Sequence, residues 1–201
     1  MLKILALIGA ALAAAAPAAA AAQIGYHARV GVVRSTKLAQ DVIVEDIVTK
    51  PGIAPAVMLG ATLPLAPRYF IGVEAAYARA GLSAAYDDGT SADLGGLGMG
   101  SVMVELEGPV AGFVRWHGGV GLLRYLPSER LGMFARGGVT RYLVGGGADF
   151  RRPAFSDWDL MVSARYDFHR FTTDELAARG FGGAQGVHRI SLSVGLARSR
   201  S

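Results

Sequence analysis

Ten charged residues, five arginines and five acids, alternate with apolar neighbours along the chain. They are Arg29, Glu74, Glu105, Arg115, Arg141, Asp149, Asp159, Arg165, Asp167 and Arg189. A guanidinium can bind a carboxylate through two parallel hydrogen bonds, which suits ion pairs in a confined space. A GC-rich genome would also enrich arginine, so the placement of these residues says more than their number. We expect them to form a network of ion pairs inside the protein.

Serine, histidine and acid side chains can form a hydrolytic site, but their spacing here disfavours one. Such catalysis needs the nucleophile and the base within hydrogen-bond reach. His188 and Ser191 are an odd number of residues apart, so a strand directs their side chains to opposite faces. His169 shares a face with Asp167, but Ser163 lies well down the strand. We therefore predict that the chain is not an enzyme, and keep a lipid-modifying enzyme as the second alternative.

Metal and cofactor sites are also not indicated by the sequence. The chain has no cysteine, and its histidines lack the ligand spacing of a zinc site. The segment 87–89, Asp-Asp-Gly, favours a plain turn, because its surroundings lack the spacing of a calcium-binding loop. The glycines from Gly95 to Gly100 are not followed by the Gly-Lys-Ser/Thr of a phosphate loop. We predict no metal and no cofactor.

The elements that position the charged residues are predicted to be β-strands. From 158 to 169 the residues alternate, with Leu160 and Val162 on one face and Arg165 and Asp167 on the other. Side chains of a strand point alternately to its two faces, so a period of two indicates a strand. The same period recurs in segments 24–34, 57–65, 69–77, 97–107, 113–122, 141–150, 158–169 and 189–196. The predicted fold class is all-β, with eight strands.

The first 22 residues have the features of a secretory signal peptide. Lys3 precedes an apolar run and an alanine tract around Pro17, whose small residues suit cleavage. No later segment has the roughly 18 continuous apolar residues of a spanning helix. Residues 23–201 are predicted to form one domain. The formal net charge of +4 is too small to indicate nucleic-acid binding.

The predicted connections between strands alternate in length. They are short near Pro67, Pro109 and Pro153, and longer after Arg34, Ala84, Tyr125 and Phe171. Short periplasmic turns and long outer loops are typical of barrels in the bacterial outer membrane. An even number of strands also places both termini on the periplasmic side. The sequence therefore predicts an antiparallel up-and-down transmembrane β-barrel in the bacterial outer membrane.

The face that points into the lumen distinguishes this barrel from a soluble one such as a lipocalin, whose interior is apolar. The polar face here consists mostly of Gly, Ser and Ala with charges, which suits a crowded lumen. A charge facing lipid near the membrane centre costs about 2–4 kcal/mol, and the mid-strand charges all lie on the polar face. Arginines of the apolar face lie at strand ends, at Arg34, Arg79, Arg124 and Arg198. Aromatic residues of that face form two expected girdles, Tyr26, Tyr69, Phe150 and Trp158 at one rim and Tyr77, Tyr142 and Phe168 towards the other.

This architecture resembles the small eight-stranded outer-membrane barrels, of which the transmembrane domain of outer-membrane protein A is the best known. The resemblance covers nearly all of residues 23–201 and rests on strand count, alternation, loop asymmetry and the charged lumen. It implies a barrel inserted by the outer-membrane insertion machinery. The last strand of such barrels usually ends in an aromatic residue, whereas residues 197–201 here are Ala-Arg-Ser-Arg-Ser.

The expected function follows from the width of the barrel. Eight strands leave an interior that side chains can fill, so we expect the charged residues to plug the lumen. The protein would then serve envelope structure or surface interaction through its outer loops. Residues 35–52 contain an apolar stretch between acids and are a candidate surface for a partner. The alternative is a wet lumen that passes small solutes.

Overall fold

The computed structural model of the chain describes residues 24–41, 47–86, 88–130, 132–178 and 183–198. The predicted signal peptide, residues 1–22, lies outside the described residues. The strands are β1 (Gly25–Ser35), β2 (Ala39–Asp41), β3 (Ile47–Pro51), β4 (Ala54–Ala66), β5 (Tyr69–Ala85), β6 (Ser91–Ala111), β7 (Val114–Pro127), β8 (Thr140–Phe155), β9 (Trp158–Phe171) and β10 (Gln185–Arg198). Two short helices, η1 (Gly132–Phe134) and α3 (Asp174–Ala178), lie in connections between strands.

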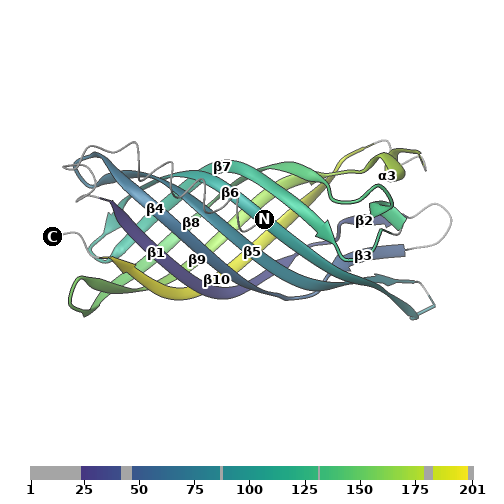
Figure 1. Cartoon of the computed structure of the whole chain (residues 1–201), viewed down its shortest axis with the longest axis horizontal. Coiled ribbons are helices and arrows are strands. Elements are labelled where there is room, and N and C mark those ends of the chain that lie inside the picture. Colours follow the sequence, from purple (N-terminus) through teal and green to yellow (C-terminus); the bar gives the residue numbers. More distant parts are fainter. Residues whose placement is uncertain (1–23, 42–46, 87, 131, 179–182, 199–201) are drawn as a thin grey trace.

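Eight of the strands close into a barrel (Figure 1). Each pairs antiparallel with its neighbours in the order β1, β4, β5, β6, β7, β8, β9 and β10, and β10 pairs back to β1. The short strands β2 and β3 form a hairpin that pairs with the end of β5. None of the helices in the described ranges is long and apolar enough to cross a membrane. The predicted fold class, an eight-stranded antiparallel up-and-down barrel, is confirmed.

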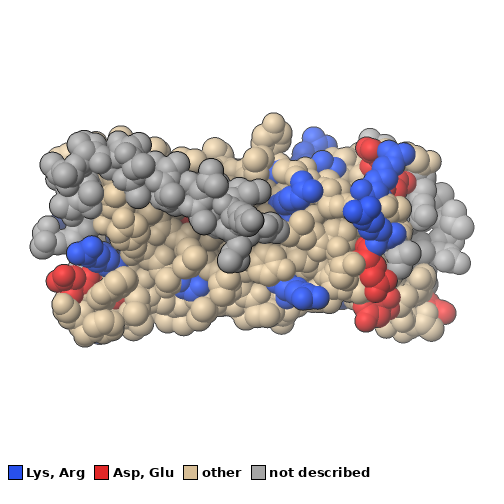
Figure 2. All heavy atoms as spheres, in the orientation of Figure 1, with Lys and Arg blue, Asp and Glu red and all other residues tan. Residues whose placement is uncertain are grey.

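Side chains alternate between the lumen, which is the space inside the ring, and the outer face. On β9, Met161 is 1% exposed, whereas its outward neighbour Val162 is 46% exposed. The outward residues are mainly apolar on all eight strands, while charged residues are buried inside. Figure 2 shows uncharged surface over most of the barrel wall on the face in view, with acidic side chains near its two ends. This is the arrangement of a membrane barrel and the reverse of a soluble one.

Three short turns lie at one end of the barrel, which we call the turn end. The predicted turns at Pro109 and Pro153 were placed wrongly, because both prolines still belong to strands β6 and β8. Both lie at an irregularity in strand pairing, as Pro64 does on β4. Proline lacks the N–H of a regular ladder and is tolerated at such bulges. The chain reverses just beyond them, at Gly112 and Ser156, whose φ angles are positive (47° and 46°).

The longer connections lie at the opposite end, which we call the loop end. The β2–β3 hairpin extends the barrel wall there, and η1 and α3 occupy two further connections (Figure 1). Strands β5 and β6 are longer than predicted, because β6 begins at Ser91 rather than near Leu97. A pairing irregularity after Gly81 and the positive φ of Gly95 (84°) let the two strands continue as a pair. The wall is therefore taller on this side.

Candidate functional site

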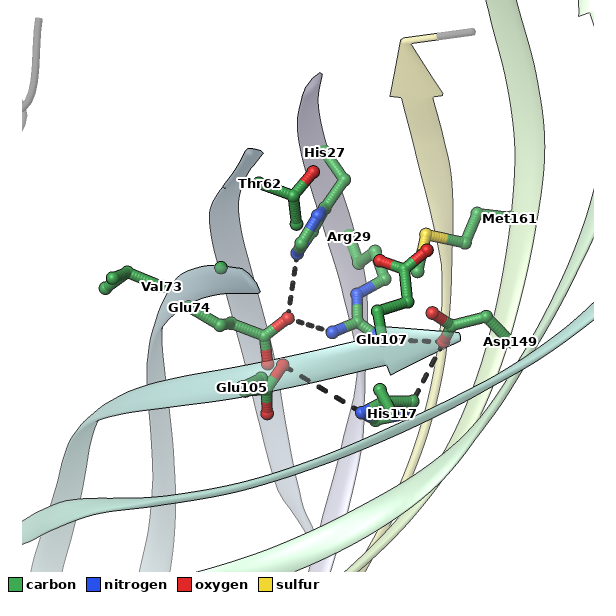
Figure 3. Close-up of a pocket in the computed structure, with 11 residues that line it drawn as sticks. His27, Arg29, Thr62, Val73, Glu74, Glu105, Glu107, His117, Asp149 and Met161 are labelled. Carbon is green, nitrogen blue, oxygen red and sulfur yellow. Dashed lines mark hydrogen bonds and ion pairs between the residues drawn. The ribbon is translucent and has the colours of Figure 1, made fainter. Parts of the chain in front are cut away.

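The centre of the lumen holds a network of ion pairs around Glu74 of β5. Its carboxylate accepts a hydrogen bond from Arg29 of β1 and lies 2.9 Å from Nε2 of His27 (Figure 3). Arg165 of β9 reaches the same carboxylate from the other side, with Nη1 3.4 Å from Oε1. All four side chains are buried. Two arginines and a histidine from across the barrel therefore converge on one acid.

Arg165 also connects Glu74 to two further carboxylates. Its Nη1 donates to Glu105 of β6, and its Nε donates to Asp167 of its own strand at 2.6 Å. Asp167 is two residues from Arg165, so both side chains point into the lumen. This guanidinium has three acidic partners in a buried position, which is the geometry that arginine's planar fork allows.

His117 and Asp149 close the network on the far wall (Figure 3). Asp149 Oδ1 lies 3.5 Å from His117 Nε2 and 3.8 Å from Arg29 Nη1. His117 Nδ1 lies 3.9 Å from Glu105 Oε2. The predicted residues Arg29, Glu74, Glu105, Asp149, Arg165 and Asp167 therefore meet in one layer, which we call the ionic layer.

Arg115 lies nearer the turn end and pairs with a residue outside the predicted set. It forms an ion pair with Glu107 of β6, and its Nη2 donates to the carbonyl of Arg68 at 3.0 Å. Arg151 Nη2 lies 2.9 Å from the same carboxylate of Glu107. Asp159 lies close by and, with Arg115 and Arg151, lines an open cavity of about 440 Å³. Glu107 and Arg151 share the polar-face spacing of the predicted residues, which is the sequence signal that could have identified them.

Arg141 and Arg189 lie nearer the loop end and have a different environment. Arg141 donates to the backbone carbonyls of Thr140, at 3.0 Å, and Thr172. Arg189 is 4% exposed and stands opposite Asp167 in the strand register. Within the described residues, Nε and Nη1 of Arg189 have no hydrogen-bond partner. The sequence placed these two arginines inside correctly, but the structure does not bring them into the ionic layer.

Two small cavities adjoin the buried charges. One, of about 10 Å³, is lined by Arg29, His117 and Asp149, and the other, of about 20 Å³, by Arg165, Asp167 and Arg189. A cavity of this size holds about one water molecule. Several polar atoms beside them, including Arg29 Nε and Asp149 Oδ1, have no hydrogen-bond partner among the described residues. Each cavity can therefore satisfy buried polar atoms with a water molecule.

Apolar side chains fill the lumen beyond Arg141 and Arg189, towards the loop end. We call this filling the apolar layer, and its buried members include Leu38, Leu97, Met99, Leu123, Tyr125, Phe134, Leu143, Phe171 and Val187. Tyr125, Phe134 and Phe171 form an aromatic cluster with ring centroids 5.2–6.1 Å apart. Phe134 comes from η1 and Leu176 from α3, so the long connections cover the layer.

The sequence analysis did not predict the apolar layer, because it characterised the polar face by its Gly, Ser, Ala and charged residues. The signal was nevertheless present near the strand ends. Leu122 and Leu123 are consecutive, as are Leu143 and Val144, so both faces of these strands are apolar there. In each pair one side chain is exposed outward and the other is buried in the lumen. A break in alternation therefore marks where the filling changes.

In the described ranges, no side-chain hydrogen bond joins a serine to either of the two histidines considered for catalysis. Nε2 of His169 lies 2.7 Å from the hydroxyl of Tyr125, and Nδ1 of His188 contacts the hydroxyl of Tyr166 on the outer face. In the part of the chain that the structure describes, Ser163 Oγ has no hydrogen-bond partner. Over the same ranges, no group of three or more His, Asp or Glu residues is arranged to hold a metal ion.

Comparison with known proteins identifies the architecture. No protein-family model matches the chain, and no curated protein matches it in sequence. Among solved structures it is similar to Neisserial surface protein A, with a TM-score of 0.53 and 13% identity over 88% of this chain and 97% of that one. The chain has the fold of the small outer-membrane β-barrels. The resemblance inferred from the sequence is thus confirmed for this barrel fold.

Two further solved barrels are also similar to this chain. Ail, the attachment invasion locus protein of Yersinia pestis, matches with a TM-score of 0.48 and 14% identity over 87% of this chain and 99% of that one. OprG from Pseudomonas aeruginosa matches with a TM-score of 0.49 and 8% identity over 87% of this chain and 94% of that one.

Proposed function

We propose that the protein is an integral barrel of the bacterial outer membrane with a closed lumen, serving envelope structure or surface interaction through its loops. The observation that carries this proposal is the double filling of the lumen. The ionic layer joins β1, β5, β6, β8 and β9 across the interior, and the apolar layer fills the space towards the loop end. Two filled layers in series support a lumen that gives neither water nor a solute a continuous path.

The orientation follows from the turn end and the loop end. In outer-membrane barrels short turns face the periplasm and long connections face outward. A signal peptide would deliver residues 23–201 to the insertion machinery, with both ends of the barrel domain on the periplasmic side. The loop end then faces the exterior and carries the β2–β3 hairpin within residues 35–52, the candidate surface for a partner.

The loop end is built as a covered surface. Nη1 of Arg136 donates to Asp174 Oδ2 at 2.8 Å, and its backbone N donates to Glu175 Oε1 at 2.7 Å. These bonds join the connection that contains η1 to the start of α3, above the aromatic cluster. We therefore assign the outward connections a second role, which is to hold the cover of the apolar layer in place.

Planar-bilayer conductance of refolded residues 23–201 tests the closed lumen. The wild type is expected to be silent. Because the layers are in series, opening either one alone leaves the other closed. Phe134→Ala with Phe171→Ala opens the apolar layer, and Glu105→Ala with Arg165→Ala opens the ionic layer. We expect steady conductance only when all four substitutions are combined.

A matched control removes two aromatic rings of the outer face, Phe150 and Phe155, which are 37% and 57% exposed and pair with the outward residues Val162 and Trp158. Phe150→Ala with Phe155→Ala should not add conductance when combined with the ionic-layer substitutions. Steady discrete conductance of the wild type would replace the closed-lumen proposal with a small channel for solutes.

A further inference from the structure

Four arginines face outward at the loop end of the barrel wall. They are Arg34, Arg79, Arg124 and Arg170, on β1, β5, β7 and β9, and all four are exposed. We call them the outer arginine ring. They occupy every second strand of the barrel. Between any two arginines that follow each other around the ring lies one strand that runs in the opposite direction. Cationic side chains are therefore distributed around the circumference rather than gathered on one side.

The strand register brings these arginines to nearly one level. Val57 pairs with Val30 on one side and with Tyr77 on the other. Arg34 lies four residues beyond Val30, whereas Arg79 lies two residues beyond Tyr77. The same offset of two residues recurs from β5 to β7 and from β7 to β9. Because barrel strands are tilted, a constant offset is what a level ring requires.

The ring lies at the border of the apolar outer surface. The outward residue two positions before each arginine is apolar or aromatic: Val32, Tyr77, Leu122 and Phe168. In Figure 2, basic patches lie on the uncharged wall towards the right, set back from the charged band at that end. In a membrane this level corresponds to the headgroups, where aromatic and long cationic side chains are both favoured.

The guanidinium groups of the ring are available to an outside ligand. Among the residues that the structure describes, no carboxylate forms an ion pair with any of the four. Arg124 donates to the hydroxyl of Thr140 at 3.2 Å, which leaves its other N–H groups free to bind. The buried arginines Arg29 and Arg165, by contrast, are paired with acids.

We infer that the outer arginine ring binds the phosphate groups of lipid headgroups in the outward-facing leaflet. A guanidinium binds phosphate oxygens through parallel hydrogen bonds, and four of them at one level can hold lipids all around the barrel. The apolar wall directly below the ring would contact the acyl chains of the same lipids. The inference rests on the proposed membrane orientation, in which the loop end faces outward.

The test compares bilayers of a zwitterionic phosphodiester lipid with bilayers that also contain an anionic phosphate monoester. Refolded residues 23–201 are placed in phosphatidylcholine vesicles, alone or mixed with phosphatidic acid, whose headgroup is a phosphate monoester. Phosphatidic acid should raise the melting temperature of the wild type and remain bound in native mass spectrometry. Arg34→Gln, Arg79→Gln, Arg124→Gln and Arg170→Gln together should abolish both effects, and each single change should weaken lipid retention by about fivefold.

Two controls locate the effect. Arg152→Gln with Arg198→Gln removes outward arginines of the turn end and should leave the response to phosphatidic acid intact. Inorganic phosphate added to phosphatidylcholine vesicles should not raise the melting temperature, and an equal rise would reassign the ring to a free anion. A full response in the fourfold variant would overturn the inference. If that variant does not refold, Arg34→Gln with Arg124→Gln provides the same comparison with half of the ring removed.

Failure of this inference is distinguishable from failure of the proposed function. Insertion into plain phosphatidylcholine, read from protease protection of the barrel, depends on the apolar wall and not on the ring. A wild type that inserts there but ignores phosphatidic acid loses only the ring inference. A wild type that does not insert would overturn the membrane proposal as well.

Discussion

The ionic and apolar layers fill the same barrel by opposite means. In the ionic layer, most side chains are held by charged partners from other strands, as Glu74 is by Arg29 and Arg165. In the apolar layer, side chains such as Leu123 are held by shape and by exclusion of water. A buried charge is stable only while its partner is present, whereas a buried leucine can be exchanged for a side chain of similar volume. The two layers should therefore respond differently to substitution.

Glycines in the wall make room for the ionic layer. Gly147 pairs with His117, and Gly145 pairs with Asp167. A Cβ added at Gly147 would lie 2.8 Å from His117 Nε2, and one added at Gly145 would overlap the Asp167 carboxylate. Glycines on the polar face would also suit a wet lumen, but at these two positions charged and imidazole side chains occupy the space that the glycines leave.

The largest predicted effect is the loss of the acid at the centre of the ionic layer. Glu74→Ala would leave Arg29 and Arg165 without one shared partner in a buried site. We expect the free energy of unfolding to fall by about 3–5 kcal/mol, measured by denaturant titration in detergent micelles. The matched control is Asp174→Ala, which removes an acid whose side chain is 78% exposed and should cost at most about 1 kcal/mol. Equal losses in the two variants would contradict a tightly paired ionic layer.

The apolar layer should lose somewhat less when one large side chain is removed. Leu123 is fully buried, and Leu123→Ala would leave a cavity among its neighbours. We expect a loss of about 2–5 kcal/mol in the same titration. Leu123→Met conserves volume and should cost less than about 1.5 kcal/mol. If methionine were as damaging as alanine, shape rather than filling would control this layer.

A smaller effect is expected when a glycine of the wall gains a methyl group. Gly147→Ala would force the His117 ring and the adjacent strand to shift, at a cost of about 1–3 kcal/mol. Gly81→Ala is the matched control, because no heavy atom lies within 4 Å of the added Cβ. Thermal unfolding of the two variants should separate them by several degrees. Equal melting temperatures would mean that the ionic layer has spare room.

Sequence periodicity predicted the barrel because each strand has one apolar face towards lipid and one polar face towards the lumen, and this alternation is visible in the sequence. The alternation from 158 to 169 became β9 with the predicted residues inside. The predicted positions of two turns were wrong, because the same local sequence is compatible with more than one structure. Pro109 and Pro153 could end a strand or sit at a bulge, and only the pairing of the neighbouring strand decides between these outcomes.

The partners within the lumen could not be predicted, because they depend on strand tilt as well as on alternation. The sequence shows that Arg115 faces inward. The register between strands decides that it lies at the level of Glu107 and not at the level of Glu74. The outer arginines illustrate the same limit. Three of them were recognised at strand ends, while Arg170 was not, and only the register shows that all four share one level.

The smallest expected effect concerns the contact between Glu175 and the backbone of Arg136. This contact lies above the apolar layer and should depend on pH. The backbone amides of Glu175 and Arg136 donate to the Glu175 carboxylate and hold its pKa below the ordinary value. A lowered pKa means that this contact stabilises the folded state above the unfolded pKa and is lost as the pH falls through the folded one. Acidification should therefore reduce the hydrogen-exchange protection of the Arg136 amide, while the barrel itself stays folded. Glu175→Gln should make that protection independent of pH. If protection falls equally in both proteins, the cover of the apolar layer is held by the packing of Phe134 and Leu176 rather than by this carboxylate.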